Sequence, residues 1–426
     1  MSNTTITQLY TMDVIMAVNN ALSKIDKRLV DHGSRVAFIA CEICDEGNLN
    51  MDMKTLFLTG IFHDIGAYKT DEVDRMIEFE TENVWNHSVY GYLFLKYLTP
   101  LRDNAEALLY HHSSWSEIQK RNTQCGDYAA LLNLADRIDM VRVYGERSTQ
   151  LNSLLYNTEG LFNDEYVNIF RNCYKKRRIF ERIEDNTFKR SNYERCSSFI
   201  TSVSEAMEYL KMIVHSIDFR SEFTVTHTIN TVSIAMNIAC HFGLDEAQLE
   251  NVYLGALLHD VGKIAIPHEI LEYPGKLTRG EMDIMKTHVK ETEYIIKGIV
   301  PDEICQIAIR HHEKLDGTGY PYGLHAEELT LPQRIVAVAD IVSALISRRS
   351  YKEPFPKEKT LAILNQMSKT QLDKSVCDYI IGNFDSIVLN TEKERQITIK
   401  LYQTIMSEYK EMLTDLNKDP VSTRLA

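Results

Sequence analysis

Apolar residues recur every three or four positions along most of the chain, which is the period of an α-helix. The pattern is clear over residues 357–369 (KEKTLAILNQMSK) and 397–413 (ITIKLYQTIMSEYKEML). Two shorter runs, 56–64 (LFLTGIFHD) and 252–260 (VYLGALLHD), are almost entirely apolar and predict buried helices that end at a His-Asp pair. The alternating pattern that marks strands is scarce. The chain is therefore predicted to be all-α.

The length of 426 residues predicts two domains, which we place at 1–200 and 201–426. Residues 175–196 (KKRRIFERIEDNTFKRSNYERC), just before this boundary, are rich in charge and lack Gly and Pro. This composition favours a helical connector over a flexible linker. The KKRR run within it is typical of a solvated helix face.

Charge and composition exclude several classes of function. The formal net charge of -13 argues against a nucleic-acid polymer as partner, but it allows a small anionic substrate at a local cationic or metal centre. The N-terminus lacks a basic segment ahead of an apolar core, and no uncharged apolar run is long enough to span a membrane. We expect a cytoplasmic protein without membrane contact.

The eight cysteines do not suggest a disulfide framework in a chain of this length. Cys41 and Cys44 have the spacing of a redox or zinc motif, but they lie in the helical run RVAFIACEIC without a second pair. The sequence favours a pair of core cysteines over a metal site.

Histidine and aspartate residues form an internal repeat. Each half of the chain contains five histidines and two aspartates in the same order. The first-half set is His32, His63, Asp64, His87, His111, His112 and Asp136. The second-half set is His227, His259, Asp260, His288, His311, His312 and Asp340. Equivalent residues lie 195 to 204 positions apart, and ten of the 14 histidines belong to the pattern, so chance does not explain it.

This combination of side chains is suited to divalent metal ions. Imidazole and carboxylate ligands suit manganese, iron, nickel and zinc, and a carboxylate can bridge two ions. Seven side chains exceed one tetrahedral site and fit a centre of two ions with positions open for water. Two ions about 3.5–4 Å apart can clamp a phosphodiester and activate water near neutral pH. The repeat therefore predicts metal-assisted hydrolysis of a phosphoester.

The second half resembles the HD-GYP subgroup of the HD-domain metal-dependent phosphohydrolases. The matching motifs are HDVGKIAIPHEIL from His259, HHEKLDGTGYP from His311 to Pro321, VAD ending at Asp340, and RRSYK from Arg348. The resemblance implies two tandem HD-type helical bundle domains with ligands that project inward from several helices. It also implies hydrolysis of a cyclic dinucleotide by the second domain.

The resemblance implies a role for each second-half residue. His227, His259, Asp260 and Asp340 would hold one ion. His288, His311 and His312 would hold a second, with Asp260 as the bridge. Lys263, one helical turn after Asp260, would neutralise a non-bridging phosphate oxygen, so that these two residues are the implied catalytic pair.

The substrate contacts implied by the resemblance are less specific. Gly317 and Gly319 would allow close backbone approach to a ligand, Tyr320 offers a ring and a hydroxyl, and Pro321 stiffens the end of the loop. The set implied for substrate binding is Lys263, Gly319, Tyr320, Arg349 and Lys352. A solvated basic cluster is the alternative reading of Arg349 and Lys352.

One departure concerns the number of ions. Some members of the subgroup hold a third metal through a glutamate four residues before the first histidine. Phe223 occupies that position here, with Glu222 beside it. We expect two ions.

The first half keeps all seven potential ligands, so its set is a possible second metal site. Ala67 stands where the second half has its lysine, Lys69 lies two residues further on, and HHSSWSEIQ replaces the HHEKLDGTGYP loop. We interpret this half as a degenerate HD domain with a regulatory or interface role. A separate phosphohydrolase site for a mononucleotide or the linear product, and an empty structural relic, are the alternatives.

A degenerate HD domain joined directly to an HD-GYP domain is similar to the tandem-HD phosphodiesterases that linearise 3′,3′-cyclic GMP-AMP in bacterial second-messenger signalling. We therefore expect that dinucleotide as substrate and contact between the two domains of the chain, with a homodimer left open. The alternatives are a cyclic di-GMP phosphodiesterase and a non-catalytic adaptor that senses a cyclic dinucleotide.

Overall fold

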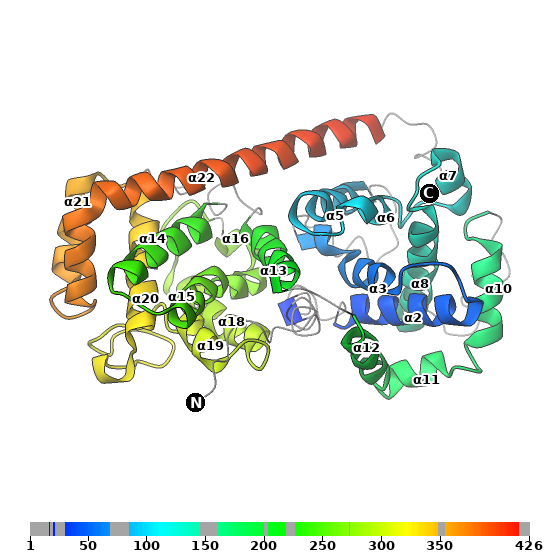
Figure 1. The fold of residues 1–426 in the computed structure, drawn as a ribbon, viewed down its shortest axis with the longest axis horizontal. Helices are drawn as coiled ribbons and strands as arrows, with labels where there is room; N and C mark the ends of the chain where they lie inside the picture. Colours follow the sequence, from blue (N-terminus) through cyan, green and yellow to red (C-terminus); the bar gives the residue numbers. More distant parts are fainter. Residues whose placement is uncertain are drawn as a thin grey trace. The chain divides into compact units, whose positions relative to one another are not determined.

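The computed structural model describes residues 17, 20–21, 30–68, 85–144, 160–199, 203–218, 226–271, 273–347 and 354–416. Every named element within these ranges is an α-helix or a 3-10 helix (Figure 1), and the only β-type pairings there are two isolated bridges. The predicted all-α class is confirmed. Across the same ranges, none of the helices combines the length and the apolar character that a membrane crossing requires.

Packing divides the chain into two compact units. One unit spans Ile213–Thr404, and the other spans Tyr10–Met212 and adds Ile405–Ala426. Helix α13 (Val203–Asp218) crosses the first boundary, and the long helix α22 (Lys374–Leu416) crosses the second. The division at 200 and 201 remains a proposal for the functional domains. The end of α22, from Ile405 to Leu416, belongs to the unit that contains Tyr10–Met212, which we call the N-terminal unit.

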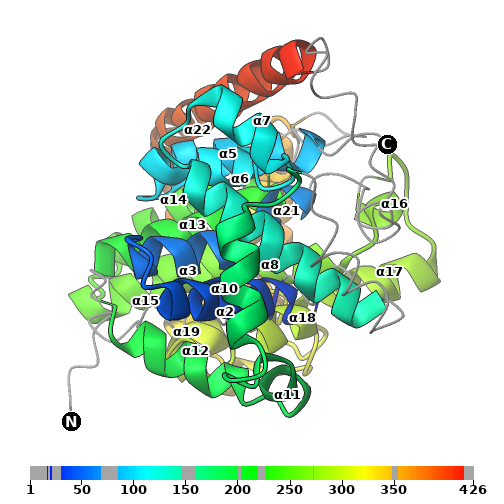
Figure 2. The same ribbon diagram turned by 90° about the vertical axis from the view of Figure 1, so that its right-hand side faces the viewer.

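The N-terminal unit is built around helices α2 (His32–Gly47), α3 (Met53–Phe62) and α8 (Gly126–Tyr144), which pack together in both views of the fold (Figures 1 and 2). The apolar stretch Val36–Cys44 of α2 is almost entirely buried, as expected for a core helix. The remaining elements are η3 (Ile65–Tyr68), α5 (Trp85–Leu98), η4 (Arg102–Asn104), α6 (Glu106–Leu109), α7 (Trp115–Arg121), α10 (Asp164–Cys173), α11 (Ile179–Glu184) and α12 (Phe188–Ser197).

The C-terminal unit has an equivalent core. Helix α14 (His227–His241) packs on α15 (Glu246–Leu258) and on α20 (Leu331–Ile346), and α15 packs on α19 (Asp302–Ile309). The remaining elements are η5 (Val261–Ala265), α16 (His268–Leu271), α17 (Arg279–Lys286), α18 (His288–Ile296), η6 (Ala326–Glu328), α21 (Lys357–Met367) and most of α22.

The glycine of each His-Asp-x-Gly motif is explained by a close approach between elements. A Cβ atom on Gly66 would lie 1.9 Å from the backbone oxygen of His87, and one on Gly262 would lie 2.0 Å from that of His288. Only glycine therefore lets η3 pack on α5, and η5 on α18, at these distances. Each contact brings the His-Asp pair next to the following histidine of its set.

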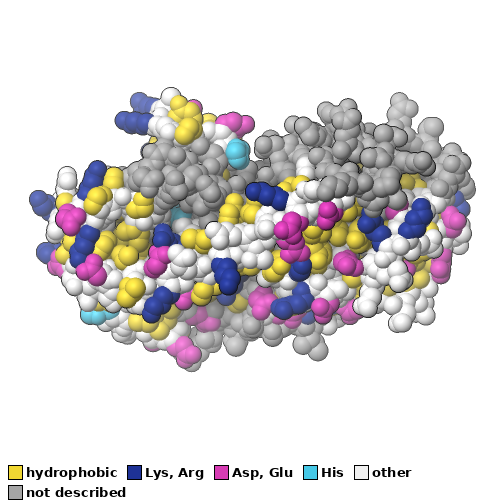
Figure 3. Space-filling model, turned by 90° about the horizontal axis from the view of Figure 1, so that it is seen from above, with side chains coloured by type: hydrophobic (Ala, Val, Ile, Leu, Met, Phe, Trp, Pro, Cys, Tyr) yellow, Lys and Arg dark blue, Asp and Glu magenta, His cyan; other side chains and the backbone are white. Residues whose placement is uncertain are grey.

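Charged side chains of both signs are interspersed on the face shown in Figure 3. The basic run before the predicted boundary also pairs with acidic side chains. Lys176 pairs with Glu46 at 2.7 Å, and Arg177 pairs with Glu42 at 3.0 Å and with Glu46 at 2.8 Å. Residues 175–196 are largely helical, as predicted, but α11 and α12 pack on α2 and belong to the N-terminal unit.

Two candidate metal centres

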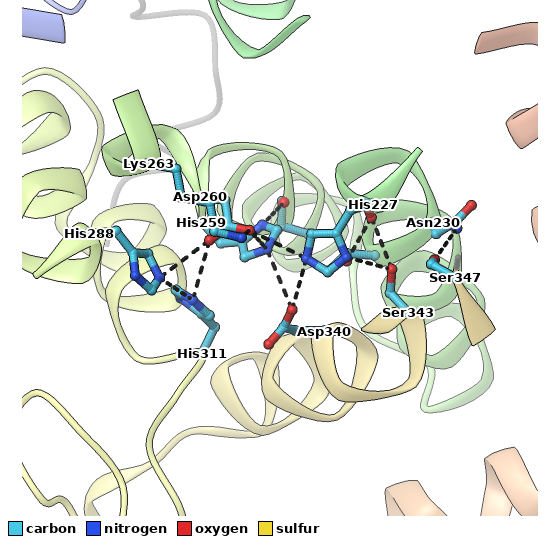
Figure 4. Close-up of polar contacts among 12 residues, drawn as sticks. His227, Asn230, His259, Asp260, Lys263, His288, His311, Asp340, Ser343 and Ser347 are labelled. Atoms are coloured by element: carbon cyan, nitrogen blue, oxygen red, sulfur yellow. Dashed lines mark hydrogen bonds and ion pairs between the residues drawn. The ribbon is translucent and has the colours of Figure 1, made fainter. Parts of the chain in front are cut away.

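The seven second-half ligands meet in the C-terminal unit, and Figure 4 labels all of them except His312. His227 and His288 are the first residues of α14 and α18, and Asp340 lies within α20. His259 and Asp260 follow directly on α15. His311 and His312 follow α19 by two and three residues. All seven residues lie together as predicted, although the metal that would occupy them stays a proposal.

Asp260 lies between two groups of histidines. Its Oδ2 atom is 3.3 Å from Nε2 of His227 and 3.1 Å from Nε2 of His259. Its Oδ1 atom is 3.3 Å from Nε2 of His288 and 3.9 Å from Nε2 of His311. Each carboxylate oxygen therefore faces a different pair of imidazoles, which is the arrangement needed to bridge two ions.

Asp340 completes the cluster on the other side. Its Oδ1 atom is 3.1 Å from Nε2 of His227 and 3.8 Å from Nε2 of His259, while Oδ2 is 3.6 Å from Nδ1 of His312. The residues assigned to the first ion are thus mutually adjacent, and Asp340 also reaches toward the second group.

The outer ring nitrogens of three histidines are held by backbone carbonyls one helical turn earlier. The contacts join Nδ1 of His259 to Ala256 O (2.7 Å), Nδ1 of His288 to Met285 O (2.6 Å) and Nδ1 of His311 to Ala308 O (2.6 Å). A carbonyl can only accept, so Nδ1 carries the proton and the Nε2 lone pair faces the cluster. This tautomer is the one that a metal ligand needs.

Several buried polar atoms in the cluster have no hydrogen-bond partner. Nε2 of His259 and Oδ1 of Asp260 are examples, although both residues are buried. A buried acceptor without a donor carries a desolvation cost that a nearby cation can offset. The buried imidazole nitrogens and carboxylate oxygens, with their inward orientation, fit divalent metal ions as ligands.

Protonation at neutral pH also suits metal binding. Burial opposes the charged form of Asp260, but electrostatic interactions with the neighbouring His259 and Lys263 hold its pKa well below the usual range. Burial lowers the pKa of His312 to about 3, so this ring is neutral and one of its two nitrogens can accept.

Lys263 lies on η5 and points to the same side as Asp260, as predicted (Figure 4). Its ammonium group forms an ion pair with Oδ2 of Asp260. The side chain is 21% exposed, so the charge stands at the edge of the buried cluster. From there it can reach a group bound beside Asp260.

The Gly-Tyr-Pro loop folds back on the histidine pair. The ring of Tyr320 lies 4.6 Å from the ring of His312 at 35°, and its backbone N–H donates to His312 O at 3.2 Å. A Cβ atom on Gly319 would lie 2.4 Å from the backbone nitrogen of Lys314, and Gly317 has φ of 74°. The structure thus gives these glycines a role within the loop itself. Close backbone approach to a ligand stays a prediction.

Glu313 was not predicted and organises this loop. Its carboxylate accepts from the backbone N–H of Tyr322 at 2.7 Å and of Leu324 at 3.0 Å. The residue is only 2% exposed. Its place directly after the histidine pair was the available signal, but its backbone partners are nine and eleven residues away and cannot be read from spacing.

The first-half ligands form an equivalent cluster in the N-terminal unit. Oδ2 of Asp64 is 3.6 Å from Nε2 of His32 and 3.2 Å from Nε2 of His63. Oδ1 of Asp64 is 4.0 Å from Nε2 of His87 and 3.7 Å from Nε2 of His111. Asp64 therefore has the same central position as Asp260.

The rest of that cluster follows the same plan. Asp136 places Oδ1 3.2 Å from Nε2 of His32 and Oδ2 3.8 Å from Nδ1 of His112. The backbone carbonyls of Gly60 and Leu108 lie 2.8 Å and 2.6 Å from Nδ1 of His63 and His111, so these rings also turn Nε2 inward. The first-half set therefore has the geometry of a metal centre.

The surroundings of the first-half cluster differ. Ala67 is buried at the position of the lysine. After the histidine pair the chain enters α7, whose N-terminus is capped by Ser114 and Glu117 in reciprocal hydrogen bonds. Within the described residues, no loop comparable to the one at Tyr320 follows this pair.

Some predicted residues lie outside the described ranges. They are Lys69, Glu222, Phe223, Arg349 and Lys352. The expectations about a third ion and about the basic substrate contacts therefore remain predictions. Cys41 and Cys44 are described and are free and buried, in agreement with the predicted core pair.

Comparison with protein families identifies both halves. Two family profiles, each described as HD domain, match residues 29–141 and residues 211–376. The matched ranges contain both seven-residue sets in full.

Two relatives illustrate the similarity. The 3′3′-cGAMP-specific phosphodiesterase 1 of Vibrio cholerae is 29% identical over 406 residues, covering 90% of this chain and 92% of that protein. The cyclic di-GMP phosphodiesterase response regulator RpfG of Xanthomonas campestris is 38% identical over 177 residues, covering 41% of this chain and 47% of that protein.

A solved structure shares the fold. The crystal structure of a cyclic GMP-AMP specific phosphodiesterase of V. cholerae, V-cGAP3, aligns with a TM-score of 0.59 over 88% of this chain and 97% of that one. The sequence identity is 18%, so the likeness concerns the fold alone.

Proposed function

This chain carries two HD domains in tandem, and from that premise we propose that it is a metal-dependent phosphodiesterase that hydrolyses a cyclic dinucleotide to a linear one. The preferred substrate in this proposal is 3′,3′-cyclic GMP-AMP, a bacterial second messenger. The observation that carries the proposal is the complete ligand set around Asp260 with Lys263 and the Tyr320 loop beside it. Similarity to a cGAMP-specific phosphodiesterase along most of both chains supports the substrate.

The residues of the C-terminal centre would hold two divalent ions. The first would be bound by His227, His259, Asp260 and Asp340, and the second by His288, His311 and His312 with Asp260 as the bridge. Manganese, iron, nickel and zinc all suit imidazole and carboxylate donors. Ions bound there would supply Lewis-acid chemistry at the phosphodiester and ease ionisation of the attacking water.

The protein's own groups then position the substrate. Lys263 is held at the rim of the cluster by Asp260, where its ammonium group can neutralise a phosphate oxygen as negative charge develops. The half-buried ring of Tyr320 beside His312 offers an aromatic surface for a base. Arg349 and Lys352 remain proposed phosphate contacts.

The N-terminal domain has a regulatory or interface role in this proposal. It keeps the metal-binding geometry around Asp64 but has Ala67 in place of the lysine and helix α7 in place of the loop. Without those two features it lacks the groups that would position a cyclic dinucleotide.

Cyclic di-GMP is the second candidate substrate. The similarity to RpfG favours it, because that relative is a cyclic di-GMP phosphodiesterase and is 38% identical over the aligned residues. Its matching segment covers less than half of either protein, whereas the cGAMP-specific relative matches both domains.

The test is to incubate the full chain, loaded with Mn²⁺, with each dinucleotide separately and to resolve the products by chromatography. We expect a linear dinucleotide from both or from 3′,3′-cyclic GMP-AMP alone, with the higher kcat/KM for 3′,3′-cyclic GMP-AMP. Metal-stripped protein is the matched control and should be inactive. Turnover of neither substrate, with binding retained, would contradict the enzyme and favour a sensing adaptor.

A further inference from the structure

The two centres differ in the group that contacts Nδ1 of the first histidine, the ring nitrogen that points away from the cluster. Nδ1 of His32 lies 2.9 Å from Oδ2 of Asp139, whereas Nδ1 of His227 lies 3.0 Å from Oγ of Ser343. Asp139 and Ser343 are equivalent, because each follows the last aspartate of its set by three residues. One histidine therefore donates to a carboxylate and the other to a hydroxyl.

The Asp139 carboxylate in the N-terminal unit is held by His32 and by Arg35. Asp139 on α8 is fully buried, and Arg35 on α2 donates to it twice, from Nε to Oδ1 at 2.7 Å and from Nη2 to Oδ2 at 2.8 Å. Arg35 also donates to the backbone oxygen of Val30 at 2.6 Å. A bidentate pair of this kind restricts both partners and keeps the carboxylate charged.

The equivalent pair in the C-terminal unit is neutral. The Ser343 hydroxyl donates to the backbone oxygen of His227 at 3.1 Å, which leaves its oxygen to accept from Nδ1 of the same residue. Asn230 occupies the position of Arg35 and donates instead to Ser347 at 3.0 Å. The partner of Nδ1 of His227 is thus an uncharged hydroxyl.

The difference matters for a metal ligand. An imidazole that donates its outer N–H to a carboxylate is fixed in orientation and is a stronger donor at its inner nitrogen. Loss of such a partner typically weakens metal affinity by about 10- to 100-fold. We propose that Asp139 and Arg35 are positioning residues that make the N-terminal centre retain a divalent cation more tightly than the C-terminal centre does.

This inference rests on the proposal that both centres bind metal, but it does not depend on which substrate is hydrolysed. It gives the two domains different roles. The N-terminal domain would hold a persistent ion, and the C-terminal centre would exchange its ions more readily with the medium.

The experiment isolates each centre in the full chain with Co²⁺ as the probe. Asp260→Ala leaves only the N-terminal centre complete, and Asp64→Ala leaves only the C-terminal one. Both proteins are dialysed against increasing chelator, and retained cobalt is measured by mass spectrometry together with its visible absorption. We expect half-release from the N-terminal centre to need about 10- to 100-fold more free chelator.

Exchange of the partner residues then assigns the cause. Asp139→Ser in the Asp260→Ala background should lower the chelator concentration for half-release toward that of the C-terminal centre. Ser343→Asp in the Asp64→Ala background is the reciprocal variant and should raise the chelator concentration for half-release. The rise should be smaller than the fall caused by Asp139→Ser, since Asn230 cannot replace Arg35. Circular dichroism checks that each variant is folded.

The proposal is overturned if the two isolated centres release cobalt at the same chelator concentration, if the C-terminal centre is the tighter, or if the N-terminal centre takes up no cobalt. It is also overturned if folded Asp139→Ser protein retains cobalt unchanged. Should Asp139→Ser unfold, comparison of the two isolated centres still decides the ranking. Metal retention is measured without substrate, so failure of the dinucleotide assay would be recognised separately.

Discussion

In the N-terminal unit the histidine pair leads into helix α7, whereas in the C-terminal unit it leads into the loop that carries Tyr320. Both units nevertheless place an aspartate between two groups of imidazoles, with Asp64 and Asp260 in equivalent positions. The ligands lie on or next to helices of the core, so they persist together. Groups for binding substrate come from short segments outside the core, so they can change without loss of the fold.

The largest expected effect concerns the central aspartate of the C-terminal centre. Asp260→Ala removes the residue that faces both groups of histidines and should lower kcat for the cyclic dinucleotide by at least about 1,000-fold. The measurement is initial rate by chromatography, with metal content determined on the same sample. Activity within a few-fold of the unaltered protein would show that the reaction occurs elsewhere.

Lys263→Ala gives the C-terminal centre the residue that the N-terminal centre has at Ala67. We expect kcat to fall by about 100-fold, because the ammonium group that would meet the developing charge is lost. Metal content should stay unchanged, since lysine is not a ligand in this assignment. A variant that keeps full kcat and loses only metal would contradict the proposed role.

Glu313→Ala tests whether the Tyr320 loop accounts for the different activities that we expect of the two centres. Loss of the two backbone contacts at Tyr322 and Leu324 should release the loop and lower kcat/KM by about 10-fold, with bound metal unchanged. Ser113→Ala is the matched control at the equivalent position and should have little effect on the rate. Equal effects of the two substitutions would argue against a specific role for the loop.

The smallest expected effect is on the free energy of unfolding. It concerns Glu42, a buried residue of the N-terminal unit that is paired with arginines. Burial opposes ionisation of Glu42, but Arg177, Arg182 and Arg195 lower its pKa below the usual value. A lowered folded-state pKa stabilises the fold above the unfolded pKa of about 4.3, and this contribution is lost as pH falls through the folded value.

Glu42→Gln should therefore lower the free energy of unfolding by about 1–3 kcal/mol at pH 7. The difference from the unaltered protein should narrow as the pH is lowered below about 4. Urea unfolding followed by circular dichroism at several pH values measures it. A difference that grows on acidification would contradict the sign of the shift.

Much of the site could be predicted because its signal is local. The repeated order of histidines and aspartates, and the apolar runs before each His-Asp pair, required only residue types and spacing, and the all-α class and the two HD domains are confirmed. The role of Gly66 and Gly262 in helix packing was not anticipated, because it depends on the distance between elements.

Features that depend on distant residues could not be predicted. Asp139 lies 107 residues from His32 and 104 from Arg35, so nothing in the sequence around either links them. The end of α22 is another case. Helical periodicity predicted the helix. It did not predict that Tyr409 would stack on Tyr90 in the N-terminal unit, with the two ring centroids 3.8 Å apart.

The rate of cyclic-dinucleotide hydrolysis by Asp64→Ala tests the central claim most directly. This substitution removes the central aspartate of the centre that lacks both the lysine and the loop, and any effect on hydrolysis should be indirect. We predict that folded Asp64→Ala protein with its C-terminal metals bound keeps a rate within a few-fold of the unaltered protein. Loss of hydrolysis comparable to that of Asp260→Ala, in protein that remains folded and metal-bound, would show that the N-terminal centre is part of the catalytic machinery.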